Sequence, residues 1–141
     1  MSEQPVTEQS ATEQQGVAVA VVVSNGKVLL VRRRVTEGEL SWQFPGGGIE
    51  DDESPAEAAA RETYEETGLD VDGILLLGAR VHPVTGRHVS YVVCALISGD
   101  AYAADDEELS EVAWVTRAEL PAYVPHGLFA PVQRYLDEHL P

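Results

Sequence analysis

Apolar and alternating residues near the start of the chain predict two strands joined by a tight turn. Residues 16–24 are almost wholly apolar, and residues 27–34 return with apolar positions before a run of arginines. Asn25-Gly26 lies between them and is the strongest short signal for a hairpin turn. Beyond this hairpin we expect a loop, a short apolar segment and a Pro-Gly-Gly-Gly run that interrupts regular structure, at 35–40, 42–44 and 45–48 respectively.

The clearest helical signal lies between residues 54 and 68. Ser54 is a suitable N-cap, Pro55 fits the first helical position, and Glu57 completes a capping box. Gly68 is suited to the left-handed cap that ends many helices. Mostly small residues recur at helical spacing and predict a face that packs closely on a sheet, namely Ala59, Ala60, Thr63, Tyr64 and Thr67.

After this helix, apolar runs alternate with turn signals. We expect strands within 71–81, 88–97 and 112–115, turns at 84–86 and 117–120, and a closing helix over 128–140. Pro131 fits that helix only if it falls in the first turn. Strands, helix, strands and helix in this order predict one α/β (α+β) domain over residues 16–141, in which a mixed sheet packs against helices.

Composition and length agree with one globular domain. The chain has 141 residues, of which 44% are hydrophobic. The polar segment 1–15 predicts a disordered lead-in with none of the features of a secretory signal. No apolar run approaches the roughly 18–20 residues that a membrane span needs. The single cysteine, Cys94, lies in an apolar run and is expected to be a buried structural thiol, which together with the other features favours a cytoplasmic location.

The charge balance is strongly acidic. There are 24 acidic and 9 basic residues, for a net charge of −15. Binding to a nucleic-acid backbone needs a basic surface, so a large nucleic acid is not the expected partner. A small polyphosphate remains compatible if it arrives with metal ions, because bound metal inverts the local field.

Three carboxylates on the predicted helix are placed in a way that local structure does not favour. Glu62, Glu65 and Glu66 share one face, where like charges repel, and they lie near the helix end at which the dipole also disfavours anions. Conflicts of this kind tend to mark functional sites, and clustered carboxylates suit Mg²⁺. The alternative is a solvated acidic face whose members pair with Arg61.

The surrounding residues resemble a known family signature. Gly47, then Glu53 after five residues, then Arg61 to Leu69 after seven more, match the signature of the Nudix hydrolases in spacing and in every fixed residue. Residues 42–47 are also similar to the usual lead-in of that family. Two positions depart from it, because Thr63 stands where an aliphatic residue is usual and Asp52 where glycine is frequent.

This resemblance implies a Nudix fold, in which a mixed β-sheet is sandwiched between α-helices, and a set of metal ligands. Mg²⁺, for which Mn²⁺ can substitute, would bind the Gly46 carbonyl and the carboxylates of Glu62, Glu65 and Glu66. A further ligand is expected from the acidic loop 105–108, with Glu108 the first choice and Glu111 the next, although a solvated loop is the alternative.

It also implies catalytic and substrate-binding roles. The catalytic set would be Glu62, Glu65 and Arg61; Glu62 would be the general base as in MutT-type members, a role that moves between subfamilies. Arg61 would orient carboxylates, and Glu53 would pair with Arg61 or hold the loop. The expected substrate-binding residues are Arg33, Gly47, Glu53 and His88. Alternation sends Arg33 to one side of its strand and its neighbours to the other, but these arginines could equally offset local acid.

The function implied is Mg²⁺-dependent hydrolysis of a diphosphate bond in a small nucleotide. A (d)NTP, oxidised or not, cleaved to a monophosphate and pyrophosphate, is the first expectation. ADP-ribose or a nucleoside diphosphate sugar is the alternative, and dinucleoside polyphosphates and capped RNA ends stay open. A third alternative is a non-catalytic nucleotide sensor, although this chain keeps every carboxylate of the signature. Homodimers are common in the family and are expected here as well.

Overall fold

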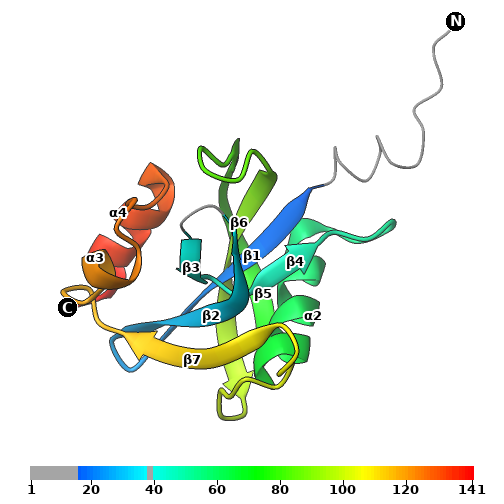
Figure 1. Ribbon diagram of the computed structural model, residues 1–141, viewed down its shortest axis with the longest axis horizontal. Coiled ribbons are helices and arrows are strands. Elements are labelled where there is room, and N and C mark those ends of the chain that lie inside the picture. The colour runs from blue at the N-terminus through cyan, green and yellow to red at the C-terminus, as the bar shows by residue number, and fades with distance from the viewer. Residues whose placement is uncertain (1–15, 38–39) are drawn as a thin grey trace, which may run out of the picture.

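A computed structural model describes residues 16–37 and 40–141 of the protein, and the predicted lead-in 1–15 lies outside them. In chain order the strands and helices are β1 Val17–Ser24, β2 Lys27–Glu37, β3 Leu40–Gln43, β4 Gly46–Gly48, α2 Pro55–Thr67, β5 Asp70–Val81, β6 His88–Ser98, β7 Leu109–Val115, α3 Leu120–Tyr123 and α4 Ala130–His139. Figure 1 shows α2 on one side of the strands and α3 with α4 on the other.

The sheet is mixed, as the order of elements predicted. Its main path runs β3-β2-β1-β6-β5, while β4 pairs with β1 and β7 pairs with β2. The β1 and β6 strands are parallel, and the other pairs are antiparallel. β1 pairs with β4 and β6 along its first part and with β2 only at its end, so β2 diverges from β4 (Figure 1).

The predicted first hairpin is confirmed, but its second strand is longer than expected. Ser24 pairs with Lys27, and both turn residues have positive φ, 53° for Asn25 and 75° for Gly26. The loop expected over 35–40 is wrong, because β2 continues to Glu37 and pairs there with Leu40 of β3. The antiparallel pairing of β2 with β3 supplies backbone hydrogen bonds to this longer strand, and a local sequence pattern does not show which segment will be the partner.

The Pro-Gly-Gly-Gly run does form regular structure, which corrects the expectation of a break. Gly46, Gly47 and Gly48 make strand β4, which pairs with Val19, Ala18 and Val17. A Cβ added to Gly46 would lie 2.3 Å from the Ala18 carbonyl oxygen. The lack of a side chain therefore permits this close pairing.

Helix α2 begins and ends where its capping signals predicted. The Ser54 side chain accepts a hydrogen bond from the Glu57 backbone, the reciprocal bond of the capping box is present, and Gly68 adopts the left-handed conformation. The predicted buried face is partly wrong, because Tyr64 is exposed whereas Ala58 and Glu66 are buried. The burial of Glu66 follows from partners on neighbouring strands.

Two threonines on the buried face of α2 satisfy their hydroxyl groups within the helix. Thr63 Oγ1 donates to the Ala59 carbonyl, and Thr67 Oγ1 donates to the Thr63 carbonyl, each at 2.7 Å. A hydroxyl bonded to the carbonyl one turn earlier can be buried without an unsatisfied donor. This explains how a threonine fits where the family usually has an aliphatic residue.

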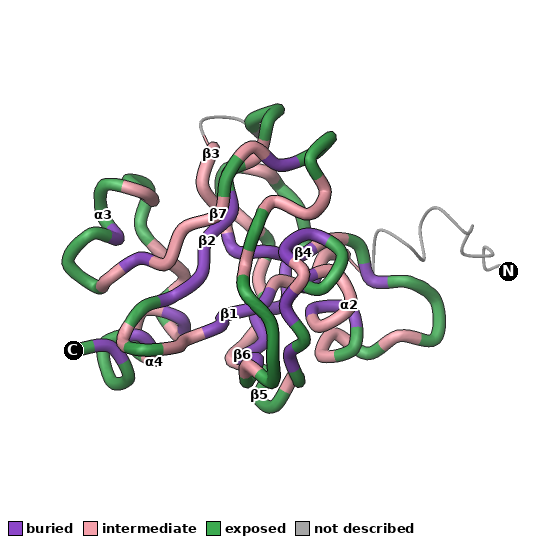
Figure 2. The backbone as a smooth tube through the Cα atoms, turned by 90° about the horizontal axis from the view of Figure 1, so that it is seen from below, coloured by how far each residue is buried: buried purple, intermediate pink, exposed green. Residues whose placement is uncertain are grey.

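Alternation along β1 separates two apolar layers. Ala18, Ala20 and Val22 pack in the layer that contains α2, and Val21 packs in the layer of α3 and α4. The central strands are largely buried in Figure 2.

Cys94 is buried as predicted, and burial raises the pKa of its thiol to about 12. Among the described residues no helix is long and apolar enough to cross a membrane.

The later elements follow the predicted order, with longer strands and one extra helix. β5, β6 and β7 contain the predicted strands, and a turn precedes Gly86. The predicted turn after Thr116 is capped by its side chain, which accepts from the Glu119 backbone, and the short helix α3 follows. The closing helix α4 begins at Ala130, two residues later than expected, and Pro131 lies in its first turn.

The contrast between two glycines of β4 predicts a difference in stability. We expect Gly46→Ala to lower the free energy of unfolding by about 1–3 kcal/mol, because its Cβ would overlap β1 backbone. Gly48→Ala is the matched control, since its Cβ would meet nothing within 4 Å, and the expected change is below about 1 kcal/mol. Urea unfolding measures both, and equal losses would contradict this close packing.

Candidate active site

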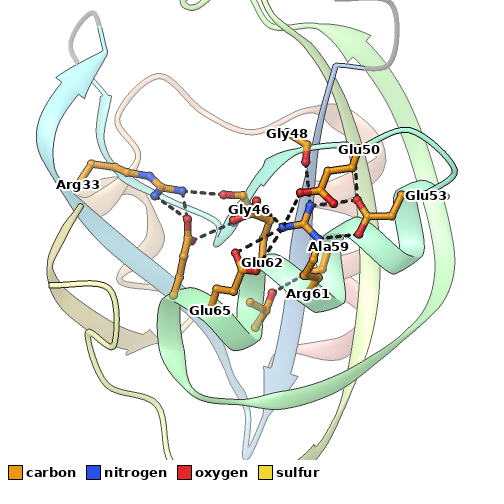
Figure 3. A network of polar contacts seen from close by, with 11 residues as sticks. Arg33, Gly46, Gly48, Glu50, Glu53, Ala59, Arg61, Glu62 and Glu65 are labelled. Carbon is orange, nitrogen blue, oxygen red and sulfur yellow. Dashed lines mark hydrogen bonds and ion pairs between the residues drawn. The ribbon is translucent and has the colours of Figure 1, made fainter. Parts of the chain in front are cut away.

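The carboxylate of Glu66 joins helix α2 to strands β2 and β4. It is 4% exposed and accepts hydrogen bonds from Arg33 Nη1 at 2.8 Å and from the Gly46 amide at 3.2 Å. Arg33 Nη2 donates to the Gly46 carbonyl at 3.1 Å (Figure 3). The guanidinium group thus occupies the space between two oxygen groups expected to bind metal, and provides the positive charge there.

The neighbouring arginines follow the predicted alternation. Arg32 points away from this site and forms an exposed ion pair with Glu111 at 3.4 Å. Arg34 donates to the Asp106 carbonyl and is also exposed. Only Arg33 of the three faces the glycine strand and α2.

Arg61 is the centre of a second ionic network, one turn earlier on α2. Its Nε and Nη2 donate to the two oxygens of Glu53 at 2.6 and 3.0 Å, and Nη1 donates to Glu62 at 3.0 Å. Nη2 also donates to the Gly48 carbonyl at 3.0 Å (Figure 3). Arg61 therefore ties the loop before the helix, the glycine strand and a predicted metal ligand into one unit.

Burial distinguishes two of the predicted metal-binding carboxylates, Glu62 and Glu66, from the carboxylate of Glu53. Desolvation raises the pKa values of Glu62 and Glu66, despite the arginines beside them. The pKa of Glu53 is lowered, chiefly by its hydrogen bonds from Arg61. The first two carboxylates are consequently the better proton acceptors, while Glu53 is held as an anion.

Glycine at position 47 allows the Glu62 carboxylate to lie against the β4 backbone. A Cβ there would lie 2.5 Å from Glu62 Cδ and within 2.7 Å of both carboxylate oxygens. Any larger residue would displace the carboxylate or the strand. Gly47 thus contributes through the absence of a side chain.

These groups line one end of a cleft of about 950 Å³. Most predicted site residues lie in its wall, namely Arg33, Gly46, Gly47, Glu62, Glu66, His88 and Glu108. Glu107 lies there as well, whereas Glu111 does not. The wall also contains apolar residues, which include Val17, Val19, Leu40, Trp42 and Phe44.

Three predicted residues lie outside this wall. Arg61 and Glu53 form an ion pair with each other and do not line the cleft, so the structure does not bring either of them into its wall as the predicted catalytic and substrate-binding roles would require. Glu65 has a side chain that is 54% exposed and lies 3.4 Å from Arg61. It faces solvent beside the cleft.

One lining residue was not identified from the sequence. Arg80 of β5 lies in the cleft wall, near the turn that leads to β6. It is the single basic residue of an otherwise mainly apolar strand, which is a weak signal. Simple alternation could not place it, because the pairing with β6 shifts register after Gly73 and again after Leu76.

The oxygen donors fit Mg²⁺ in chemical type. Carboxylates and a backbone carbonyl are its preferred protein ligands, and Gly47 allows one of them to approach the loop. Over residues 16–37 and 40–141 no three acidic, histidine or cysteine side chains already form a compact metal-binding group. Glu66 and Glu62 are instead bonded to different arginines, Arg33 and Arg61.

The fold is a mixed sheet between helices, and its glycine strand lies against the helix that carries the carboxylates. A family model described as the NUDIX domain matches residues 14–139, and the chain belongs to that family. A NUDIX hydrolase from Nitrosomonas europaea has a similar structure, with a TM-score of 0.71 and 25% identity over 86% of this chain and 69% of that one.

Two curated relatives share shorter stretches. An RNA pyrophosphohydrolase of Tolumonas auensis is 46% identical over 61 residues, which are 43% of this chain and 33% of that protein. An 8-oxo-dGTP diphosphatase of Proteus vulgaris is 33% identical over 76 residues, which are 52% of this chain and 68% of that protein. The chain thus spans about a third of the length of the first of these relatives.

The two arginine environments predict unequal effects on stability. We expect Arg33→Gln to lower the free energy of unfolding in EDTA by about 3 kcal/mol, because the buried Glu66 carboxylate would lose its cation. Arg32→Gln is the matched control, and its exposed pair with Glu111 predicts a loss below about 1 kcal/mol. If the two variants unfold at the same urea concentration, the Arg33–Glu66 contact does not stabilise the fold.

Proposed function

We propose that this protein hydrolyses a diphosphate bond in a small nucleotide, with a (d)NTP, ordinary or oxidised, as first substrate and Mg²⁺ as cofactor. The observation that carries this proposal is the gathering of Glu62, Glu66 and the Gly46 carbonyl at one end of a cleft large enough for a nucleotide. Both curated relatives are named for cleavage of phosphate anhydrides, which agrees with it.

The residues that would hold Mg²⁺ are the Gly46 carbonyl, Glu62, Glu65 and Glu66, with Glu108 from the facing loop. When bound, the metal neutralises the diphosphate and makes a coordinated water more acidic. Mn²⁺ would serve in the same way. Glu65 can contribute from its exposed position only by turning away from Arg61.

The chain's own residues supply positioning and proton transfer. Glu62 accepts the proton of the attacking water, a role that its raised pKa suits. Arg61 holds that carboxylate by a charged hydrogen bond while it fixes Glu53 and the Gly48 carbonyl. Arg33, which lies beside Glu66 and the Gly46 carbonyl, would donate hydrogen bonds to phosphate oxygens of the substrate.

Several broader expectations belong to this proposal. The net charge of −15 disfavours a long nucleic acid as substrate, although one relative is named for RNA. ADP-ribose or a nucleoside diphosphate sugar is the second substrate class. A cytoplasmic location and a homodimer stay predictions.

A substrate panel tests the reaction class. We expect Mg²⁺-dependent release of a monophosphate and pyrophosphate from a nucleoside triphosphate, and no turnover in EDTA. The panel contains the four dNTPs, 8-oxo-dGTP, ADP-ribose, UDP-sugars, diadenosine polyphosphates and a 5′-triphosphorylated oligoribonucleotide, with products separated by chromatography. Nucleotide binding without turnover of any member would instead indicate a non-catalytic sensor.

A single carboxylate variant tests the proposed machinery. Glu66→Gln should reduce kcat about a hundredfold or more, which is the range for loss of a group that acts at the reacting centre. Glu138→Gln, on the exposed side of α4, is the control of equal chemistry and should retain wild-type kcat. Both variants are first compared by urea unfolding. Near-normal turnover of a folded Glu66→Gln protein would exclude Glu66 from the reaction.

A further inference from the structure

The cleft has an acidic end and a basic end. Its only lining carboxylates in the described part of the chain belong to Glu62, Glu66, Glu107 and Glu108, and the Glu108 carbonyl accepts from the Arg34 amide of β2. The chain has just nine Lys and Arg and four His. Six of these residues line the cleft, namely Arg33, Arg80, His82, Arg87, His88 and His126. Apart from Arg33 and His126, they belong to β5, β6 and the turn between them.

Arg80 is fixed in this basic end by aromatic contacts. Its Nε donates to the Tyr91 hydroxyl at 3.2 Å, and its Cζ lies 4.9 Å from the centre of the Phe129 ring and 5.7 Å from that of Tyr91. Among described residues no carboxylate lies within ion-pair distance of it, and its two Nη groups donate to no protein atom. Among the residues that the structure describes, this guanidinium is therefore oriented by aromatic contacts and has no carboxylate partner.

The register of the paired strands gives the distance between the acidic end and the basic end of the cleft. Gly48, Val17, Val89 and Arg80 are consecutive partners across β4, β1, β6 and β5. Three steps between neighbouring strands amount to roughly 14 Å. A ligand with its diphosphate at the glycine strand therefore needs a spacer, such as a sugar, before a second anionic group can meet Arg80.

The chemistry at this end favours an anion over a nucleobase. Phe129 already covers one face of the guanidinium, and the free Nη donors lie in its plane. In-plane paired donors match the oxygens of a phosphate group, and the positive charge of Arg80 stabilises an anion more than a neutral base. The strongly acidic remainder of the protein repels long polyanions, which points to a small nucleotide.

We propose that the Arg80 end of the cleft is a second anion subsite, which binds a 3′-phosphate of the nucleotide whose 5′-diphosphate lies at Glu62 and Glu66. This inference rests on the proposed function, which places the diphosphate at the acidic end. The preferred substrates would then carry phosphate on both sides of the ribose. The first phosphodiester of an oligonucleotide offers the same chemistry from a larger source.

A binding experiment tests the subsite without catalysis. Full-length protein in EDTA is titrated with adenosine 5′-monophosphate and with adenosine 3′,5′-bisphosphate, and the fluorescence of Trp42 in the cleft wall reports binding. The titrations are run with Mg²⁺ as well as with EDTA, because neither ligand contains a diphosphate bond that the protein could hydrolyse. With Mg²⁺ we expect about tenfold tighter binding of the bisphosphate, which is the contribution of one charged hydrogen-bonded contact. Equal affinities of the wild-type protein for the two ligands in Mg²⁺ would overturn the proposal.

Variants assign the preference to Arg80. Arg80→Ala should bind both ligands equally, and Arg80→Lys should keep part of the preference because it keeps the charge but not the paired donors. Arg134→Ala removes the same charge from the exposed side of α4 and should keep the full preference. A folded Arg80→Ala protein that still favours the bisphosphate would overturn the assignment.

Two further results separate this inference from its alternatives. If the 5′-phosphorylated dinucleotide pApA binds more tightly than the bisphosphate, the small-nucleotide source is wrong and a phosphodiester is the ligand. A bisphosphate preference in a protein that hydrolyses no nucleotide would support the subsite and count against the proposed function. Hydrolysis without any such preference would do the reverse.

Discussion

The contact on which the site depends is the buried pairing of Glu66 with Arg33 across the Gly46 peptide group. A carboxylate that is 4% exposed needs compensation, and here it receives a guanidinium and a backbone amide from two different strands. The contact fixes α2 against β2 and β4 at one point. It also keeps a cation between oxygen groups that would otherwise repel each other.

Glycine makes this close arrangement possible. Gly46 can pair with β1 only without a side chain, and Gly47 leaves space for the Glu62 carboxylate. Arg61 then donates to Glu53 in the loop before α2 and to the Gly48 carbonyl of β4, so it links that loop to the glycine strand. Arg61 and Glu53 support the site from outside the cleft wall, while burial raises the pKa values of the lining residues Glu62 and Glu66.

The net charge of the chain does not show how unevenly its basic residues are distributed. A chain of net charge −15 concentrates much of its small basic complement in one cleft, opposite its buried carboxylates. Under the two proposals made above, an anion binds at both ends of the cleft, with metal at one end and with Arg80 at the other. We therefore expect the acidity of the whole chain to limit the size of an anionic partner, but not to exclude a small anion.

The sequence by itself determined the features that depend on neighbours along the chain. The Asn25-Gly26 turn, the caps at Ser54 and Gly68 and the carboxylate spacing on α2 all follow from local hydrogen bonding and helical periodicity. Only the tertiary structure decided which of those carboxylates is buried, that glycines 46–48 form a strand, and that Arg80 enters the cleft. Each of these depends on a partner distant in sequence: Arg33 for Glu66, β1 for the glycines, and a β6 pairing whose register shifts reorient β5.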